Sequence, residues 1–133
     1  MTEDTDPFEY FFDLPWSDGL PVVTPTEERL ARMLEGTSRA PEEVIGEIPP
    51  ANNQATVENT ALHAVMAGCR PAFFPIVLGA LEAMLKKPFN LLGIQATMFT
   101  GGPLLILNGP YAREIGVHAG SGCFGPGFRA NAS

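Results

Sequence analysis

The residues best suited to chemistry lie together in one glycine-rich stretch near the end of the chain, residues 117–133. Cys123 follows His118 by five positions, and Arg129 comes six positions later. A thiol beside a proton acceptor and a cation is the combination that produces a nucleophile or a redox group. The stretch therefore predicts a Cys–His site in which Cys123 and His118 are catalytic.

The four glycines of this stretch predict a binding loop around the same groups. Glycine takes positive φ without steric cost, so such a run turns N–H groups inward and suits an anion or a developing negative charge. Gly120, Gly122 and Gly125 also have the G-x-G-x-x-G spacing of dinucleotide-binding sites. That spacing indicates such a site only between a strand and a helix, and the sequence predicts neither beside these glycines. We expect an anion- or carbonyl-binding loop, with a loop ordered only by packing as the alternative. Its predicted substrate-binding residues are Gly120, Ser121, Gly122, Gly125 and Arg129.

Four further polar residues are candidates outside the loop. Glu58 is one of three acids after residue 47, and it is either paired with a base or a general base, the third catalytic candidate. Gln95, Thr97 and Asn108 lie on or at the end of predicted strands. Such positions commonly contact substrates in open sheets, so these three are predicted to line the site.

The second histidine and the second cysteine are interpreted as packing residues. His63 lies in the middle of a predicted helix, and Cys69 lies at a helix corner. Two histidines and two cysteines are suitable zinc ligands, but no pair has the usual ligand spacing. Metal binding is therefore kept as an alternative, no metal ligand is assigned, and the sequence names no cofactor.

Three helices are predicted in the first two thirds of the chain. The first begins at Thr24 as N-cap and ends at Gly36. The second covers residues 55–67 and ends at Gly68, and its face is rich in alanine. The third covers residues 71–87. The second and third form a tight helical hairpin.

Two strands are predicted after the hairpin. Residues 92–98 alternate apolar with polar or small residues, and residues 104–108 are a continuous apolar run suited to burial on both faces. Residues 46–54 are predicted to be a loop, and a short helix is expected from Pro110 to about 115. The fold class is α/β or α+β, with the helical hairpin packed on a small sheet. Because two strands make a poor sheet, we expect another chain or segment to complete it.

Charge divides the chain and excludes several function classes. Residues 1–47 carry 12 acids and 3 bases, whereas the rest carries 3 acids and 5 bases. Residues 1–23 are predicted to form an acidic aromatic arm, and residues 24–133 one domain that is incomplete alone. Scattered bases argue against nucleic acid, and no apolar run reaches membrane-spanning length. The acidic start lacks the basic region of a signal peptide, so we expect a cytoplasmic protein with reduced thiols.

Several short segments together resemble a known protein family. They are residues 64–71 (AVMAGCRP), 93–97 (GIQAT), 107–110 (LNGP) and 124–132 (FGPGFRANA). The pattern resembles, over roughly residues 13–133, poorly characterised bacterial proteins associated with (seleno)proteins that carry a UGSC motif. The resemblance implies thiol- or selenol-related chemistry, although this chain has Gly120-Ser121-Gly122-Cys123 in place of Cys-Gly-Ser-Cys. It also implies that the fold continues after Ser133 with a long apolar helix, supplied by a second polypeptide that is either a separate chain or the other product of a cleaved precursor.

These observations predict a subunit of a small-molecule enzyme, of the lyase, hydratase or thiol-redox type. In it the loop amides and Arg129 hold an oxyanion or carboxylate, while Cys123 and His118 carry out the reaction. One alternative is a non-catalytic assembly subunit of a hetero-oligomer. The other is a metal-binding enzyme subunit.

Overall fold

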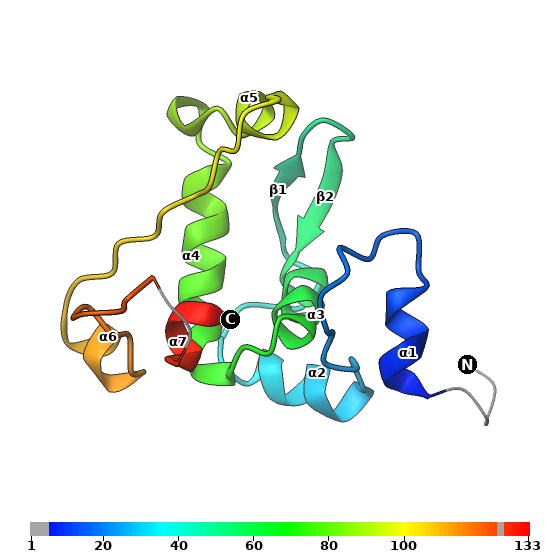
Figure 1. The fold of residues 1–133 in the computed structure, drawn as a ribbon, viewed down its shortest axis with the longest axis horizontal. Coiled ribbons are helices and arrows are strands. Elements are labelled where there is room, and N and C mark those ends of the chain that lie inside the picture. The colour runs from blue at the N-terminus through cyan, green and yellow to red at the C-terminus, as the bar shows by residue number, and fades with distance from the viewer. Residues whose placement is uncertain (1–5, 125–126) are drawn as a thin grey trace.

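The computed structural model describes residues 6–124 and 127–133 as a set of short helices with one small sheet. Gly125 of the predicted loop lies outside the described residues. Figure 1 shows the helical hairpin at the centre, the N-terminal helix on one side and the C-terminal segments on the other. The elements in chain order are α1 (Pro7–Phe12), α2 (Glu27–Leu34), β1 (Val44–Ile48), β2 (Asn53–Thr56), α3 (Val57–Met66), η1 (Pro71–Phe73), α4 (Phe74–Met84), η2 (Lys87–Phe89), α5 (Leu91–Ala96), α6 (Pro110–Glu114) and α7 (Arg129–Ala132).

The hydrophobic core lies where α2, α3 and α4 meet. Phe74 at the start of α4 and Val57 at the start of α3 are completely buried. The alanine-rich face of α3 packs here, as its sequence predicts, because small side chains allow the helices to approach closely. The buried cluster consists of Met33, Val57, Ala61, Ala64, Val65, Phe74 and Leu78.

Local capping explains where α3 begins and ends. The Thr56 hydroxyl accepts a hydrogen bond from the Asn59 N–H (3.2 Å), and the Asn59 side chain accepts one from the Thr56 N–H (2.8 Å). This reciprocal pair is a capping box. At the other end Gly68 has φ +81°, a conformation that glycine adopts without strain. The predicted end of this helix is confirmed.

Helix α2 begins after a different N-cap residue from the one predicted. Thr26, not Thr24, is the N-cap, because Thr26 has extended backbone angles and its hydroxyl accepts the Arg29 N–H. The helix ends close to Gly36, where an added Cβ would lie 2.2 Å from the Pro71 carbonyl oxygen. Glycine at this position therefore lets α2 approach the corner that joins α3 to η1.

The sheet lies where a loop was predicted. Residues 46–54 belong to an antiparallel hairpin in which Gly46 pairs with Ala55 and Ile48 pairs with Asn53. The turn carries Asn52 at φ +55°, which asparagine tolerates better than most residues. The prediction failed because both strands are short and polar at the turn, so neither shows a clear apolar alternation.

The two strands predicted after the hairpin were wrong. Residues 91–96 form helix α5, since Leu91 and Ile94 also match a helical spacing and so short a segment does not separate the two periods. Residues 104–108 are extended, but within the described chain they belong to no sheet. The fold is nonetheless a mixed one, with helices and a two-stranded antiparallel sheet.

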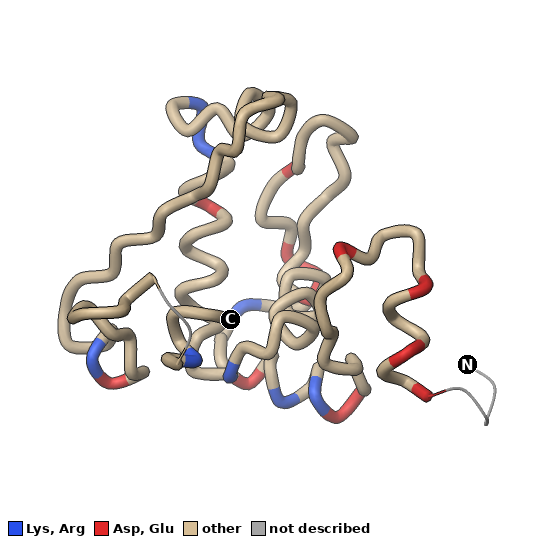
Figure 2. Tube along the Cα trace, viewed as in Figure 1, with Lys and Arg blue, Asp and Glu red and all other residues tan. Residues whose placement is uncertain are grey.

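The acidic N-terminal segment carries helix α1 and buries part of its aromatic cluster within this chain. Phe11 is 8% exposed and packs edge-on against Tyr10, with Trp16 nearby. Phe8 and Trp16 stay exposed. Figure 2 shows acidic residues concentrated on this side, while the C-terminal segments opposite are mostly uncharged. The domain boundary after residue 23 stays a prediction.

Two longer-range features complete the fold. Arg39 donates to Glu43 (2.8 Å) and to Glu82 (2.6 Å), which ties the segment before β1 to α4. These carboxylates raise the pKa of Arg39 further above the neutral range, and Arg39 lowers the pKa of Glu43. Among the described residues, no helix has the length and apolar character needed to cross a bilayer.

Candidate functional site

The glycine-rich loop is held in shape by Asn131 of α7. The Asn131 side chain accepts the His118 N–H (2.9 Å) and donates to the carbonyls of His118 (2.9 Å) and Cys123 (3.1 Å). Within the loop, the Cys123 N–H bonds to the Gly120 carbonyl, and Gly122 has φ +84°. This is the geometry in which a turn requires glycine at its third position. The glycine spacing thus forms a turn, and Asn131 fixes it.

The His118 side chain makes contacts within the loop and with Phe128. Its ring stacks on Phe128 with centroids 3.8 Å apart and planes 13° apart. Its Nε2 lies 3.1 Å from the Ser121 carbonyl oxygen. A carbonyl can only accept, so Nε2 carries the proton and donates. Among the hydrogen bonds of the described residues, none joins His118 to the Cys123 thiol, so the structure places these two groups in one loop without pairing them.

Arg129 contacts the carbonyl end of α3. Its Nε and one terminal nitrogen donate to the Gly68 carbonyl oxygen at 3.0 and 2.8 Å. A cation at the C-terminus of a helix interacts favourably with the helix dipole. Arg129 therefore joins α7 to the α3 corner, and two of its donors are already occupied.

The remaining predicted site residues lie elsewhere. Glu58 is exposed in the first turn of α3, about 15 Å along the helix axis from Gly68 at a rise of 1.5 Å per residue. Gln95 lies in α5 and Thr97 directly follows it, and Figure 1 shows α5 at the far end of α4 from α7. Asn108 is exposed just before α6. The premise for the roles of Gln95, Thr97 and Asn108 was wrong, because none of them lies on a strand.

A large groove runs along α4. Its volume is about 760 Å³, and its walls come from the β-hairpin, α3, α4, the 105–107 segment and the C-terminal end. None of its lining residues is an Asp, Glu, Lys or Arg within the described chain. The apolar lining includes Ile48, Phe73, Ile76, Val77, Leu81, Met84, Leu105, Leu107, Ile115 and Val117.

The groove contains the histidine and cysteine that the sequence analysis assigned to packing. His63 Nδ1 lies 2.7 Å from the Asn59 carbonyl oxygen, so Nδ1 is protonated and Nε2 is an acceptor in the neutral ring. Cys69 also lines the groove, and burial raises the pKa of its thiol, partly offset by Ser133 and Arg129. The partner of His63 is a backbone carbonyl, which every residue type carries, so no residue in the sequence signals this arrangement.

The described residues contain no group of three or more His, Cys, Asp or Glu side chains placed to hold a metal ion. His63 and Cys69 line the groove, whereas His118 and Cys123 belong to the loop. The four candidate ligands are therefore divided between two sites.

Comparison with known proteins gives this chain no relative. No protein-family model, no curated protein and no solved structure matches it.

Proposed function

We propose that this chain is an assembly subunit whose groove binds an apolar, extended segment of a second, different polypeptide. The partner segment adds a β-strand beside residues 104–107. The observation that carries the proposal is that this apolar segment follows an extended course and, within the described chain, belongs to no helix or sheet (Figure 1).

Both the backbone and the side chains of residues 104–107 indicate that the segment can pair with a strand of another polypeptide. Among the described residues, no backbone hydrogen bond joins residues 101–108 to another segment. Leu105 and Leu107 line the groove and alternate with Leu104 and Ile106, which do not. Leu104, Leu105 and Ile106 are 66%, 54% and 73% exposed. Such alternation is the period of a β-strand, here apolar on both faces. A strand edge with unpaired N–H and C=O groups is a template for another strand.

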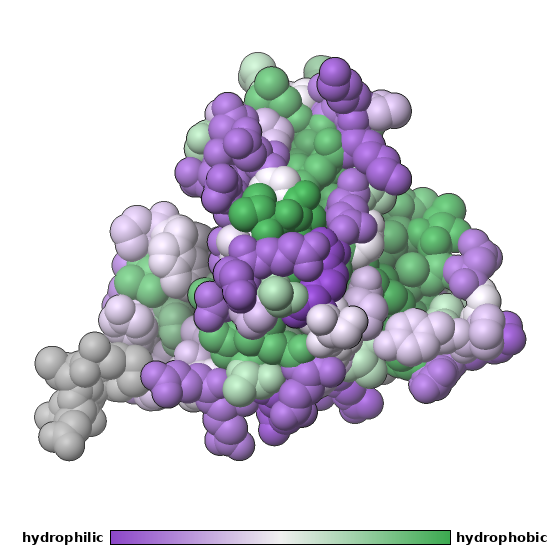
Figure 3. All heavy atoms as spheres, turned by 180° about the vertical axis from the view of Figure 1, so that it is seen from behind, coloured by the Kyte–Doolittle hydropathy of each residue, from purple (hydrophilic) through white to green (hydrophobic). Residues whose placement is uncertain are grey.

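The surface around the segment agrees with burial against a partner. Figure 3 shows hydrophobic residues gathered on the side of the molecule opposite the N-terminus. Monomeric soluble proteins rarely leave large contiguous apolar patches exposed. No Asp, Glu, Lys or Arg of the described chain lines the groove, so a mostly apolar segment fits it best.

The groove also favours a different polypeptide over a second copy of this chain. In a self-paired strand, Leu105 and Leu107 of each copy would still face that copy's own groove. The backbone would then be satisfied, but the groove would remain unfilled. A different chain that supplies a strand and further apolar side chains fills both.

The proposal is tested by native mass spectrometry of the protein purified from the cells that produce it. We expect a complex heavier than the 14.2 kDa chain that contains a second polypeptide. Ile106→Pro removes one backbone donor at an exposed side chain, so it should release the partner, whereas Ile106→Ala keeps the donor and should retain it. A monomer, a complex of identical copies only, or retention by Ile106→Pro contradicts the proposal.

A second proposed function is a small-molecule enzyme in the assembled protein, with His63 and Cys69 as its catalytic pair. The support is that both line one groove of the size that small-molecule sites have. As with His118 and Cys123, no hydrogen bond among the described residues joins the two side chains. The Nε2 lone pair of His63 is the proton acceptor, and the Cys69 thiol is the nucleophile. This proposal keeps the lyase, hydratase or thiol-redox class and moves its residues from the loop to the groove.

Iodoacetamide labelling tests this pair. Burial raises the pKa of Cys69, so we expect Cys69 to react more slowly than Cys123 at neutral pH and to accelerate as the pH rises. His63→Gln should slow Cys69 by more than about tenfold at neutral pH and leave Cys123, the internal control, unchanged. An unaltered Cys69 rate in His63→Gln would exclude His63 as its base.

A further inference from the structure

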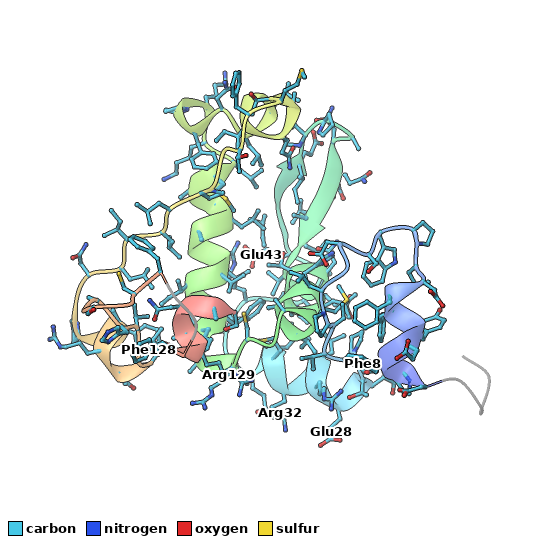
Figure 4. The ribbon with its side chains drawn as sticks, in the orientation of Figure 1. Phe8, Glu28, Arg32, Glu43, Phe128 and Arg129 are labelled. Atoms are coloured by element: carbon cyan, nitrogen blue, oxygen red, sulfur yellow. The ribbon has the colours of Figure 1, made fainter. Side chains whose placement is uncertain are left out.

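A second, smaller pocket lies on the other side of Cys69 from the groove, between α2, the corner after α3, and α7. Its volume is about 130 Å³, and three arginines contribute to its lining: Arg29, Arg32 and Arg129. Figure 4 shows Arg32 and Arg129 at the same edge of the molecule, although they come from α2 and α7. The fold thus brings three cations from distant parts of the sequence to one hollow.

None of the three arginines is neutralised by a carboxylate among the described residues. The ion pairs found there both belong to Arg39. Glu28, one helical turn before Arg32, forms no ion pair with it within the described chain. Three like charges around a small hollow repel one another, and an anion placed between them would relieve that repulsion.

Two of the arginines are already fixed in position. One terminal nitrogen of Arg29 donates to the Thr24 carbonyl oxygen (2.5 Å), and Arg129 donates twice to Gly68. Each guanidinium has five N–H donors, so both keep donors for a ligand. Because these side chains are held before binding, less side-chain entropy is lost when an anion arrives. Arg32, exposed and without a hydrogen bond in the described chain, is able to close over it.

We propose that this pocket binds a compact oxyanion, a phosphate, sulfate or carboxylate group of a small molecule, through Arg29, Arg32 and Arg129. The proposal does not depend on the partner strand or on the His63–Cys69 pair. Guanidinium groups match such oxygens in geometry as well as in charge. The remaining walls, among them Val23 and Met33, limit the pocket to a small group.

Isothermal titration of the full chain with inorganic phosphate, and in a parallel arm with acetate at equal ionic strength, tests the site. We expect saturable phosphate binding that weakens as salt rises, because the contacts are ionic. Acetate tests the carboxylate version of the ligand: comparable binding supports a carboxylate ligand, and phosphate binding alone supports a phosphate or sulfate. Absence of saturable binding in both arms overturns the proposal.

Variants locate the binding. Arg32→Gln should weaken phosphate binding by about tenfold or more, and Arg32→Lys, which keeps the charge, should weaken it less. Arg113→Gln on α6 removes an arginine that does not line the pocket and should bind as the unaltered chain does. Thermal unfolding without phosphate shows that each variant folds. If Arg32→Gln folds and binds phosphate as tightly as Arg113→Gln does, the site is not this pocket.

Discussion

At the scale of single residues, the loop that carries Cys123 depends on one side chain that sequence analysis missed. Asn131 makes three hydrogen bonds to the backbone of His118 and Cys123. Nothing local in the sequence indicates this role of Asn131, because its partners are 8 and 13 positions away. The cysteine, histidine and glycines of the loop are visible by type, but the contact that orders them arises only from the fold.

Asn131→Ala should therefore loosen the loop. We expect faster amide exchange over residues 118–124 and a loss of about 1–2 kcal/mol in the free energy of unfolding, since water replaces part of each exposed hydrogen bond. Asn131→Asp keeps the acceptor for the His118 N–H and loses both donors, so it should fall between Ala and Asn. Hydrogen exchange and urea unfolding measure both effects. Unchanged exchange in Asn131→Ala would show that the loop is ordered by something else.

The same scale explains why sequence analysis did not single out His63 and Cys69 as site candidates. His63 and Cys69 were assigned to packing because each has a satisfactory structural role when seen alone. Their shared groove forms only when α3, α4 and the C-terminal segments come together. The sequence shows which residue types are available for chemistry. Which of them line a cavity together depends on contacts between segments that are distant in the sequence.

At the scale of elements, α2, α3, α4 and α6 were predicted as helices, whereas α1 was not, and α5 was predicted as a strand. The end of α3 at Gly68, the start of a helix near Pro71, and the short helix α6 follow from local signals: a cap, a proline and a period. A strand requires a partner, so the β1–β2 hairpin was missed, and residues 104–108 were predicted as a strand from their apolar run alone. The spacing of apolar residues in a short segment such as 91–96 fits both a helix and a strand, so its contacts with the rest of the chain determine which one forms.

Alanine substitutions at Gly36 and, as a control, at Gly79 test how closely α2 packs against the corner after α3. Gly36→Ala would place a Cβ against the Pro71 backbone, which cannot move without shifting the α3–η1 corner, so we expect a loss of about 2 kcal/mol or more. Gly79→Ala is the control: it lies exposed within α4 with no atom within 4 Å of the added Cβ, and it should gain about 0.5–1 kcal/mol. Urea unfolding compares the two. Equal changes in stability would contradict the close contact of α2 with this corner.

At the scale of the whole molecule, the mixed fold was predicted, but its organisation was not. The described chain has a core at one end of the helical hairpin and an open apolar groove along α4. The low charge of the C-terminal two thirds is explained if the groove and residues 104–107 are buried by a partner. Of the two predicted strands, only residues 104–108 are extended, and they lie beside that groove; completion by another chain stays a proposal.

Hydrogen exchange at the amides of residues 104–107 tests this central claim most directly. The chain alone and the native complex are compared by mass spectrometry under the same conditions. We predict rapid exchange in the isolated chain and slowing by about a hundredfold or more in the complex, because a partner strand protects alternate amides by hydrogen bonding. Equally rapid exchange in both, with a second polypeptide present, would contradict strand addition at this segment.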